Sequence, residues 1–233
     1  MAFDTVQQAR QSECAYVDIH CHNANGIQTL EVLSIDTLDF DPTTTNNRFY
    51  SLGLHPWYID RQDIQTALKK IASCGADSKL LAIGECGLDK TITTPLSLQT
   101  EVFNAQIKLA EQLGKPLIIH CVRAYNELIQ LKKSGNSTEI GWIIHGFNAN
   151  PALADQLIKH GFYLSFGAAL LNPCSRAGQA LLETPQNRLF LETDTAELAI
   201  DAIYAAAAKM LGVDVATLRR QILDNFKRVF LND

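Results

Sequence analysis

The chain has 233 residues, of which 47% are hydrophobic and 19% are charged, and its formal net charge is −5 at pH 7. This length can bury one large core, so a single domain over residues 1–233 is the simplest expectation. The absence of any long apolar run or block of like charge excludes a membrane-spanning protein and argues against a general nucleic-acid coat.

Cysteine usage and the first residues bear on the compartment of the protein. Six cysteines occur without a Cys-x-x-Cys pair, and residues 1–10 lack the apolar core of a signal peptide. In a chain of this length such cysteines are most simply reduced thiols. We therefore expect a cytoplasmic protein with no membrane contact.

Short apolar runs recur along the chain, and most are rich in Ile, Val, Leu and Phe without clean alternation. That pattern is typical of strands covered on both faces. The eight predicted strands span residues 15–20, 28–35, 49–54, 80–84, 117–120, 141–145, 162–166 and 189–192.

The segments between most of these runs show helical spacing of apolar residues. The predicted helices span residues 60–73, 95–113, 124–133, 151–159, 175–182, 196–211 and 214–231. Strands that alternate with helices indicate an α/β protein with a parallel sheet, and eight strands indicate a closed TIM-type (β/α) barrel.

The first two connections depart from this regular pattern. Only residues 23–27 separate the first two predicted strands, whereas a parallel crossover needs roughly a dozen residues. Residues 36–48 are rich in Thr, Asn and Asp and resemble a loop. We therefore expect a barrel that is trimmed or distorted near its first two strands, and antiparallel pairing of the second strand stays open.

The first predicted strand ends in Asp18-Ile19-His20-Cys21-His22. Because side chains alternate along a strand, Asp18, His20 and His22 are expected on one face. Two imidazoles and a carboxylate on one face can chelate a metal ion. Two hydrogen-bonded histidines at a strand end would give the same pattern.

Similar side chains follow the other predicted strands. His55, His120 and His145 end a strand or follow it, and Glu85 and Asp194 occupy the same kind of position. The carboxyl ends of all strands of a parallel barrel meet at one face, where active sites form. These residues are therefore expected to converge although they lie far apart in the sequence.

The order of the motifs carries a resemblance. The chain contains Asp-x-His-x-His, Gly-x-His-Pro, Gly-Glu-x-Gly-Leu-Asp, two strand-end histidines and Glu-Thr-Asp, in that order. Together they resemble the TatD family of metal-dependent deoxyribonucleases, which belongs to the amidohydrolase-like barrels. The resemblance covers nearly the whole chain, and it implies a divalent-metal-dependent hydrolase.

The resemblance also implies a site with two divalent ions, which could be zinc, manganese or magnesium. The implied metal ligands are His20, His22, Glu85, His120, His145 and Asp194. Glu85 would bridge the ions, with His20, His22 and Asp194 on one of them and the remaining two histidines on the other. Asp194 would orient the attacking water and take its proton, so Glu85 and Asp194 are the implied catalytic residues.

Other residues are assigned to supporting roles. By the resemblance, His55 and Arg123 lie beside the scissile phosphate and bind the substrate, with Arg123 at the start of a helix. Asp18 would either fix a histidine or form a plain hydrogen bond at the strand end, and Asp89 would orient its neighbours or cap a loop. Trp57 either offers a face for base stacking or packs in the interior.

The resemblance is weaker in the loops that would hold a substrate. Asn23-Ala24 follow the first motif where the family commonly has Leu-Asp, and Thr195-Ala196-Glu197 run into a helix where it has Ser-Pro. The expected substrate is a DNA end. The alternatives are another small phosphoester, an ester or an amide, or a non-catalytic metal-binding relative, and no protein partner can be inferred.

Overall fold

The computed structural model describes residues 6–12, 15–23, 29–41, 45, 48–135 and 140–233. Eight strands form one sheet in chain order, and every neighbouring pair is parallel. An isolated parallel bridge between Cys21 and Asp194 joins the first strand to the chain that follows the last one. The predicted TIM-type barrel is confirmed, and the second strand pairs parallel.

Each strand overlaps one of the eight predicted ranges. The strands are β1 (Tyr16–Cys21), β2 (Thr29–Asp36), β3 (Tyr50–Gly53), β4 (Leu80–Asp89), β5 (Leu117–Val122), β6 (Trp142–Ile144), β7 (Phe162–Phe166) and β8 (Leu189–Leu191). Their apolar side chains are almost all fully buried, as expected for strands covered on both faces.

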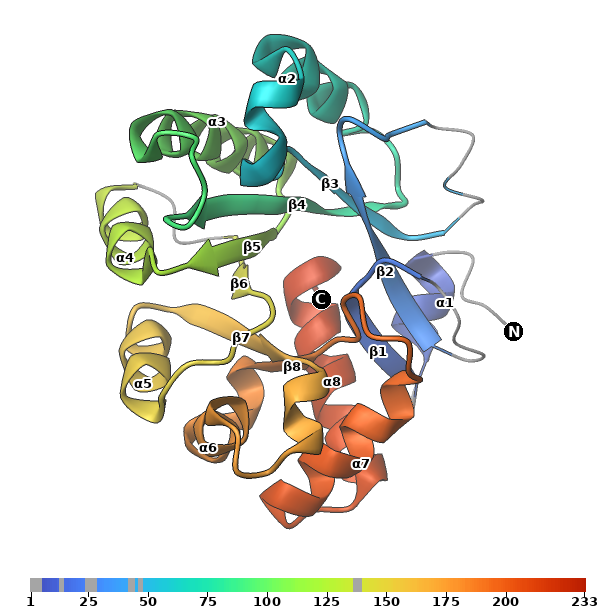
Figure 1. Cartoon of the computed structure of the whole chain (residues 1–233). Coiled ribbons are helices and arrows are strands. Elements are labelled where there is room, and N and C mark those ends of the chain that lie inside the picture. Colours follow the sequence, from blue (N-terminus) through green and yellow to red (C-terminus); the bar gives the residue numbers. More distant parts are fainter. Residues whose placement is uncertain (1–5, 13–14, 24–28, 42–44, 46–47, 136–139) are drawn as a thin grey trace.

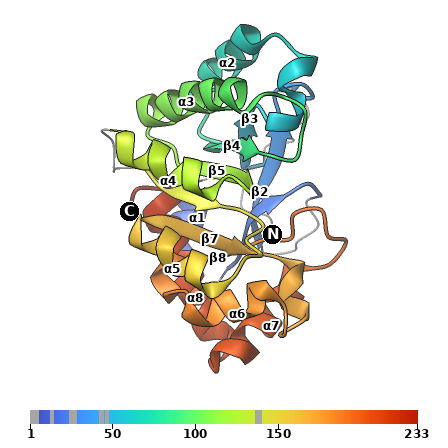
Figure 2. The same cartoon turned by 60° about the vertical axis from the view of Figure 1, so that its left-hand side comes forward.

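Helices cover the outside of most of the sheet. They are α1 (Val6–Gln11), α2 (Ile64–Ser73), α3 (Leu96–Leu113), α4 (Tyr125–Ser134), α5 (Pro151–Lys159), α6 (Arg176–Glu183), α7 (Ile200–Leu211) and α8 (Val215–Phe230). Three short 3-10 helices complete the set: η1 (Pro56–Arg61), η2 (Ala168–Leu171) and η3 (Gln186–Arg188). Figures 1 and 2 show α2 to α7 following one another around the outside of the strands.

Two predicted helix starts are wrong. The helix predicted over residues 60–73 begins at Ile64, because Asp63 caps α2 by accepting a hydrogen bond from the Thr66 backbone N–H. The helix predicted from residue 196 begins at Ile200. The residues before it form turns, in which the Ala196 N–H donates to the Thr193 carbonyl oxygen.

The two connections that the sequence predicts to be irregular join β1 to β2 and β2 to β3. The first of them falls mainly on residues 24–28, which lie outside the described residues. After β2, residues 37–39 and residue 45 form turns. In Figure 1 β1 and β2 lie toward the right-hand side with α1, and α7 reaches β1, where the Tyr204 hydroxyl donates to the Val17 carbonyl oxygen.

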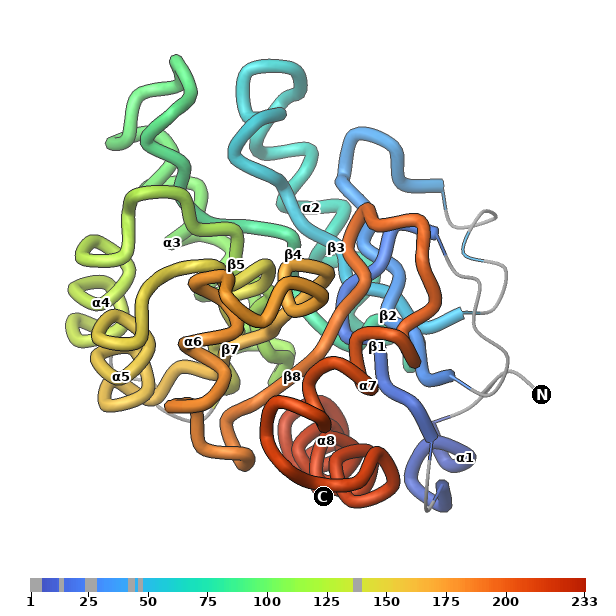
Figure 3. Tube along the Cα trace, turned by 60° about the horizontal axis from the view of Figure 1, so that its bottom comes forward, coloured from blue at the N-terminus to red at the C-terminus, as the bar shows by residue number. Residues whose placement is uncertain are grey.

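Helix α1 contacts the residues that follow α8, and both helices lie in the lower half of Figure 3. Arg10 of α1 donates to the Leu231 carbonyl oxygen at 2.7 Å, and the Lys227 ammonium of α8 donates to the Ser12 carbonyl oxygen at 2.7 Å. The Arg219 guanidinium lies 4.0 Å from the centre of the Tyr16 ring. These cations of α8 are therefore used in contacts within the chain.

Two strands carry an extra residue where the predicted ligands lie. On β1, Asp18 pairs with Glu31 and Cys21 with Leu33, so three steps on β1 match two on β2. On β4, a similar shift lies between Ile83 and Cys86. An extra residue bends a strand and turns its side chains to new directions, and here it does so at His20 and at Glu85.

Close contact between β4 and β5 requires glycine on both sides of Glu85. A Cβ atom at Gly84 would lie 2.5 Å from the Ile118 carbonyl oxygen, and one at Gly87 would collide with the His120 carbonyl oxygen. Both glycines also have a positive φ, at 154° and 143°. The Gly-Glu-x-Gly motif thus lets Glu85 and His120 lie on closely packed neighbouring strands.

The buried cysteines and the helices agree with the expectations for them. Cys21, Cys86 and Cys121 are free and packed in the core, as strand alternation predicts. In the part of the chain that the structure describes, none of the helices is long and apolar enough to cross a membrane.

Candidate metal centre

The predicted ligands meet at the carboxyl ends of the strands. His20 and Glu85 lie in β1 and β4 and His120 in β5, whereas His22, His145 and Asp194 follow strands. They surround or adjoin a cavity of about 410 Å³. Its lining comprises His22, Ser34, Asp36, His55, Trp57, Tyr58, Glu85, His120, His145, Asp194 and Thr195.

Glu85 lies at the middle of this group, and its side chain is only 11% exposed. Its Oε1 atom lies 2.9 Å from His120 Nδ1 and 2.7 Å from His145 Nε2. Its Oε2 atom faces His20 Nε2 at 3.4 Å. The two oxygens of one carboxylate thus face different histidines, which is the arrangement that a ligand shared by two cations requires.

Asp194 lies beside the histidines of the first motif. Its Oδ1 atom is 3.5 Å from the Nε2 atoms of both His20 and His22. The backbone places it there, because its N–H donates to the His20 carbonyl oxygen and its own carbonyl accepts from the His22 N–H. Asp194 also has a φ of 54°, in the left-handed region that non-glycine residues seldom adopt.

The donor set fits a divalent cation. His20 is fully buried, and neither of its ring nitrogens has a hydrogen-bond partner among the described residues. Buried polar atoms without partners are costly and rare in folded proteins. Three groups of ligand atoms lie within 4.8 Å of one another: His20 with His145 and Asp194, His20 with His22 and Glu85, and His55 with Glu85 and His120.

Mutual attraction shifts the pKa values of the group. Burial lowers the pKa of His20, but the carboxylates of Asp194 and Glu85 outweigh it and raise the value to about 9. Burial would raise the pKa of Glu85, yet the nearby charge of His145 and a hydrogen bond to His120 hold it well below its usual range. Burial likewise lowers the pKa of His145, but the Glu85 carboxylate outweighs it and raises the value, so without metal His20 and His145 hold protons that a cation would have to displace.

Each histidine of the second pair has another carboxylate at its far ring nitrogen. His120 Nε2 lies 3.1 Å from Asp89 Oδ2, and His145 Nδ1 lies 3.4 Å from Glu192 Oε1. Such a carboxylate keeps the proton on the outer nitrogen and leaves the inner one free to bind a metal. Asp89 and Glu192 stand inside quoted motifs, but only the fold pairs each with its histidine.

His55 differs from His120 and His145, because the inner nitrogen of its neutral ring carries the proton. Its Nδ1 accepts a hydrogen bond from the Trp57 backbone N–H at 3.1 Å, so a neutral ring carries its proton on Nε2. That nitrogen lies 3.0 Å from Glu85 Oε1. His55 is thus arranged as a hydrogen-bond donor, which suits the predicted contact with a phosphate better than metal ligation.

Arg123 is not part of this cavity. It is exposed, has a φ of 56° and directly precedes Ala124, the N-cap of α4, so it lies at the start of a helix as predicted. It follows β5 directly and therefore lies at the same end of the barrel as His120.

Asp36 and Tyr58 line the cavity but were not predicted as site residues. Asp36 ends β2 and accepts hydrogen bonds from the backbone N–H groups of His55 and Leu38. Burial raises its pKa above the ordinary value. The position of Asp36 at the end of a predicted strand is the feature of the sequence that could have identified it as a site residue.

Asp18 does not share the direction of His20. The extra residue in β1 breaks the expected alternation, and Asp18 accepts hydrogen bonds from the Thr193 backbone N–H at 3.0 Å and from the Thr193 hydroxyl at 2.6 Å. It contacts the His20 backbone N–H, at 3.4 Å, rather than a histidine ring. Of the two roles expected for Asp18, the structure favours the plain hydrogen bond at the strand end over the support of a histidine ring.

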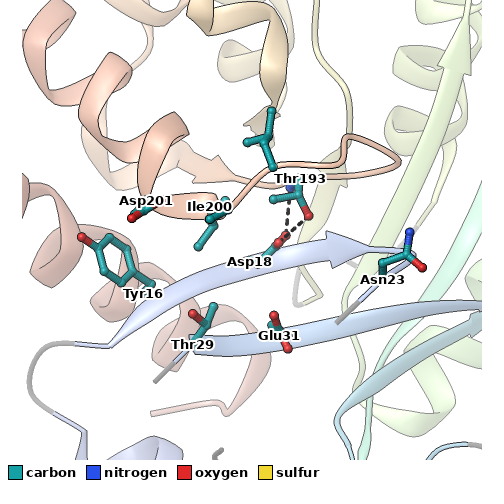
Figure 4. A pocket seen from close by; sticks show the side chains of 10 residues that line it. Tyr16, Asp18, Asn23, Thr29, Glu31, Thr193, Ile200 and Asp201 are labelled. Atoms are coloured by element: carbon teal, nitrogen blue, oxygen red, sulfur yellow. Dashed lines mark hydrogen bonds between the residues drawn. The ribbon is translucent and has the colours of Figure 1, made fainter. Parts of the chain in front are cut away.

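A second cavity, of about 250 Å³, lies where Asp18 points (Figure 4). Tyr16 and Asp18 from β1, Glu31 from β2 and the first residues of α7 line it. Asp18 and Glu31 are paired across the two strands. Burial raises the pKa of Asp18 to about 7.

Comparisons with known proteins agree with this geometry. A family model described as TatD related DNase matches residues 5–231. The uncharacterized metal-dependent hydrolase YabD of Bacillus subtilis is 34% identical over 149 residues, which are 63% of this chain and 58% of YabD. The uncharacterized metal-dependent hydrolase YcfH of Escherichia coli K12 is 29% identical over 79% of this chain and 74% of YcfH.

The fold is also shared with solved structures. The crystal structure of YjjV, a TatD homologue from Escherichia coli K12, has a TM-score of 0.81 and 20% identity, covering 94% of this chain and 99% of YjjV. A TatD family hydrolase from Entamoeba histolytica has a TM-score of 0.76 and 14% identity, covering 95% of this chain and all of that one. At these identities the likeness concerns the fold alone.

The position of Glu85 predicts how metal binding responds to its loss. Glu85→Ala should lower the content of every bound divalent ion, because its two oxygens face different histidines. Elemental analysis after dialysis against zinc or manganese measures this, with Glu127→Ala as a matched control on α4. Full metal content in Glu85→Ala would contradict the shared-ligand role.

The raised pKa of Asp18 predicts a pH dependence of stability. The value is about 7 in the folded chain against an ordinary value of 3.8, so the stabilising contribution is present below 3.8 and is lost as the pH rises through 7. The Tm of wild type should therefore fall relative to that of Asp18→Asn between pH 4 and pH 7, and the difference should be constant above that.

Thermal melts of both proteins in a chelator measure this difference. The chelator removes effects of metal binding, and the other titrating groups are shared by the two proteins. A difference in Tm that does not change with pH would show that Asp18 titrates normally in the folded chain.

Proposed function

Because the chain belongs to the family of TatD-related DNases, we propose that it hydrolyses phosphodiester bonds at DNA ends with a water activated by two divalent metal ions. The observation that carries this proposal is the Glu85 carboxylate, whose two oxygens face different histidines. The names of its relatives as metal-dependent hydrolases support the reaction class.

The proposed metal ligands are His20, His22, Glu85, His120, His145 and Asp194. Bound divalent ions would supply a nucleophilic water at neutral pH and stabilise the charge on the phosphate. Zinc, manganese and magnesium are all compatible with a set of imidazoles and carboxylates.

Asp194 is the proposed proton acceptor. Burial would raise its pKa, but the nearby imidazoles of His20 and His22 hold it below the usual range, so it is ionised at neutral pH. Its side chain is 37% exposed, which leaves it open to the cavity. Glu85 is more enclosed, and its proposed part in catalysis is to hold the centre together.

Donors beside the centre would hold the substrate. The Nε2–H of His55 points into the centre, where it can donate to a phosphate oxygen instead of Glu85. Arg123 lies outside the cavity at the same end of the barrel, and its guanidinium suits a neighbouring phosphate of the same strand. Trp57 is 49% exposed and lines the cavity, so base stacking is now favoured over internal packing.

The cavity and the charge favour an unpaired DNA end. A cavity of about 410 Å³ has room for roughly one nucleotide rather than a duplex. The net charge is −5, and the Lys and Arg side chains of α8 described above contact the chain itself. Binding should therefore rest on about two or three phosphate contacts and show a shallow salt dependence.

A digestion series tests the function. Single-stranded, blunt duplex and closed circular DNA are incubated with the metal-supplied protein at rising salt, alongside a nitrophenyl phosphodiester and the corresponding monoester. Single-stranded ends should be cut fastest, and Arg123→Ala should lower kcat/KM for DNA without changing metal content. Efficient cutting of closed circles would exclude an end-directed enzyme.

The same series separates the alternative. Turnover of small esters without cutting of any DNA would identify a hydrolase of another small phosphoester, ester or amide. No turnover of any substrate by protein with full metal content would identify a non-catalytic metal-binding relative.

The proposed base gives a further prediction. Asp194→Asn keeps the shape of the side chain but cannot accept the proton, so the rate should fall by about 10²-fold or more. The rate is compared at equal metal content, with Asp201→Asn on the nearby start of α7 as control. A rate equal to that of wild type in Asp194→Asn would show that Asp194 does not accept the proton.

A further inference from the structure

One carboxylate beside the centre has no part in the proposed reaction. Asp89, the last residue of β4, is 1% exposed and accepts four hydrogen bonds. Its Oδ1 accepts from the backbone N–H and the hydroxyl of Thr91, at 2.8 Å and 2.5 Å. Its Oδ2 lies 2.8 Å from the indole Nε1 of Trp57 and 3.1 Å from His120 Nε2.

Asp89 cannot turn toward the substrate. A carboxylate offers about four acceptor positions, and all four are occupied. Its backbone is held as well, because the N–H donates to Gln99 Oε1 at 2.7 Å and the carbonyl accepts from Gln99 Nε2 at 2.9 Å. Gln99 itself is buried. Asp89 is therefore a fixed acceptor whose position is set by β4 and α3.

The fixed acceptor determines the form of His120. An ionised carboxylate only accepts hydrogen bonds, so the ring nitrogen that faces it must carry the proton. A neutral His120 then keeps its lone pair on Nδ1, the atom that lies 2.9 Å from Glu85 Oε1. Two acceptor atoms at that distance need a cation or a proton between them. In metal-free protein a second proton on Nδ1 fills this place, and a bound metal ion would replace it.

The same oxygen also holds the exposed indole. Trp57 lies in η1 at the edge of the cavity, and its ring is edge-on to the rings of His55 and His120, with centroids 5.0 Å and 5.7 Å away. Its Nε1–H is its only donor and it points at Asp89. This bond sets the angle at which the ring is presented to the cavity.

We propose that Asp89 is a positioning residue shared by the metal centre and a nucleobase subsite: it holds His120 with Nδ1 free for a metal ion and holds Trp57 as the stacking surface for the terminal base. The proposal deepens the proposed function and rests on it for the identity of the ligand. Because one oxygen serves both donors, ion binding at His120 and the setting of the indole are coupled.

Such coupling is reciprocal. A cation bound to His120 Nδ1 makes the Nε2–H of that ring a stronger donor to Asp89 Oδ2. The hydrogen bond from Trp57 to the same oxygen then changes in strength. By linkage, a base stacked on Trp57 changes the affinity for the metal by the same factor. Neither effect requires cutting of DNA, so both can be measured when hydrolysis is absent.

The test uses zinc as the probe in a Trp142→Phe background, where Trp57 is the remaining tryptophan. In Asp89→Asn one of the two carboxylate oxygens becomes an amide NH₂ group, which cannot accept a hydrogen bond. One pair of donors therefore loses its acceptor. Zinc affinity, measured by competition with a chelating dye, should fall about 10- to 100-fold, as for other carboxylates behind a ligating histidine. Asp63→Asn, which alters an exposed helix cap on α2, is the control and should bind zinc normally.

Two spectroscopic readouts separate positioning from a loss of folding. Ring ¹⁵N shifts of His120 in metal-free protein should show Nε2 fully protonated in wild type, whatever the state of Nδ1, and only partly protonated in Asp89→Asn. Acrylamide quenching of Trp57 should change on zinc addition in wild type but not in the variant. A short oligothymidylate should protect Trp57 in zinc-bound wild type and protect it less in the variant.

These readouts can overturn the proposal without any variant. Wild-type protein in which His120 is protonated on Nδ1 alone, or in which Trp57 quenching responds to neither zinc nor oligothymidylate, would refute it. So would wild-type zinc affinity in Asp89→Asn. Failure of the proposed function is a separate result, since it shows as absent DNA cleavage while the zinc and ¹⁵N results stand.

Discussion

The buried carboxylate of Glu85 is the constraint on which the rest of the centre depends. An anion that is 11% exposed is stable in the fold only when cationic or hydrogen-bonding groups surround it. Imidazoles from β1, β5 and the ends of β3 and β6 do so here. The extra residue in β4 and the flanking glycines allow that strand to bring the carboxylate to this point.

Closure of the barrel and construction of the centre occur at the same residue. The backbone of Asp194 bonds to His20 and His22 and so links the end of the sheet to its beginning. Its side chain faces the rings of the same two histidines. Few backbone conformations allow one residue both to form these backbone hydrogen bonds and to direct its side chain at the two rings. This restriction accounts for the left-handed conformation of Asp194.

Carboxylates behind the histidines divide the rings into two kinds. Asp89 accepts a hydrogen bond at the outer nitrogen of His120, and Glu192 lies 3.4 Å from that of His145, so the inner nitrogen of each ring is the one placed to bind a cation. A backbone N–H occupies the outer nitrogen of His55, so that ring directs a proton inward. One type of side chain thus supplies both ligands and a donor, according to what lies behind it.

The sequence by itself determined the barrel and the members of the centre. Apolar runs buried on both faces, separated by helical segments, are enough to predict parallel strands, and histidines and acids at strand ends are enough to predict their convergence, because all the strands of such a barrel end at one face. Only the tertiary structure decided which way each side chain points. The extra residue in β1 directs Asp18 toward Thr193. Helix α7 begins only at Ile200, because turns follow β8. Arg123 lies outside the cavity. Each of these depends on register and on contacts between strands distant in sequence, and a periodic pattern within one segment carries no information about either.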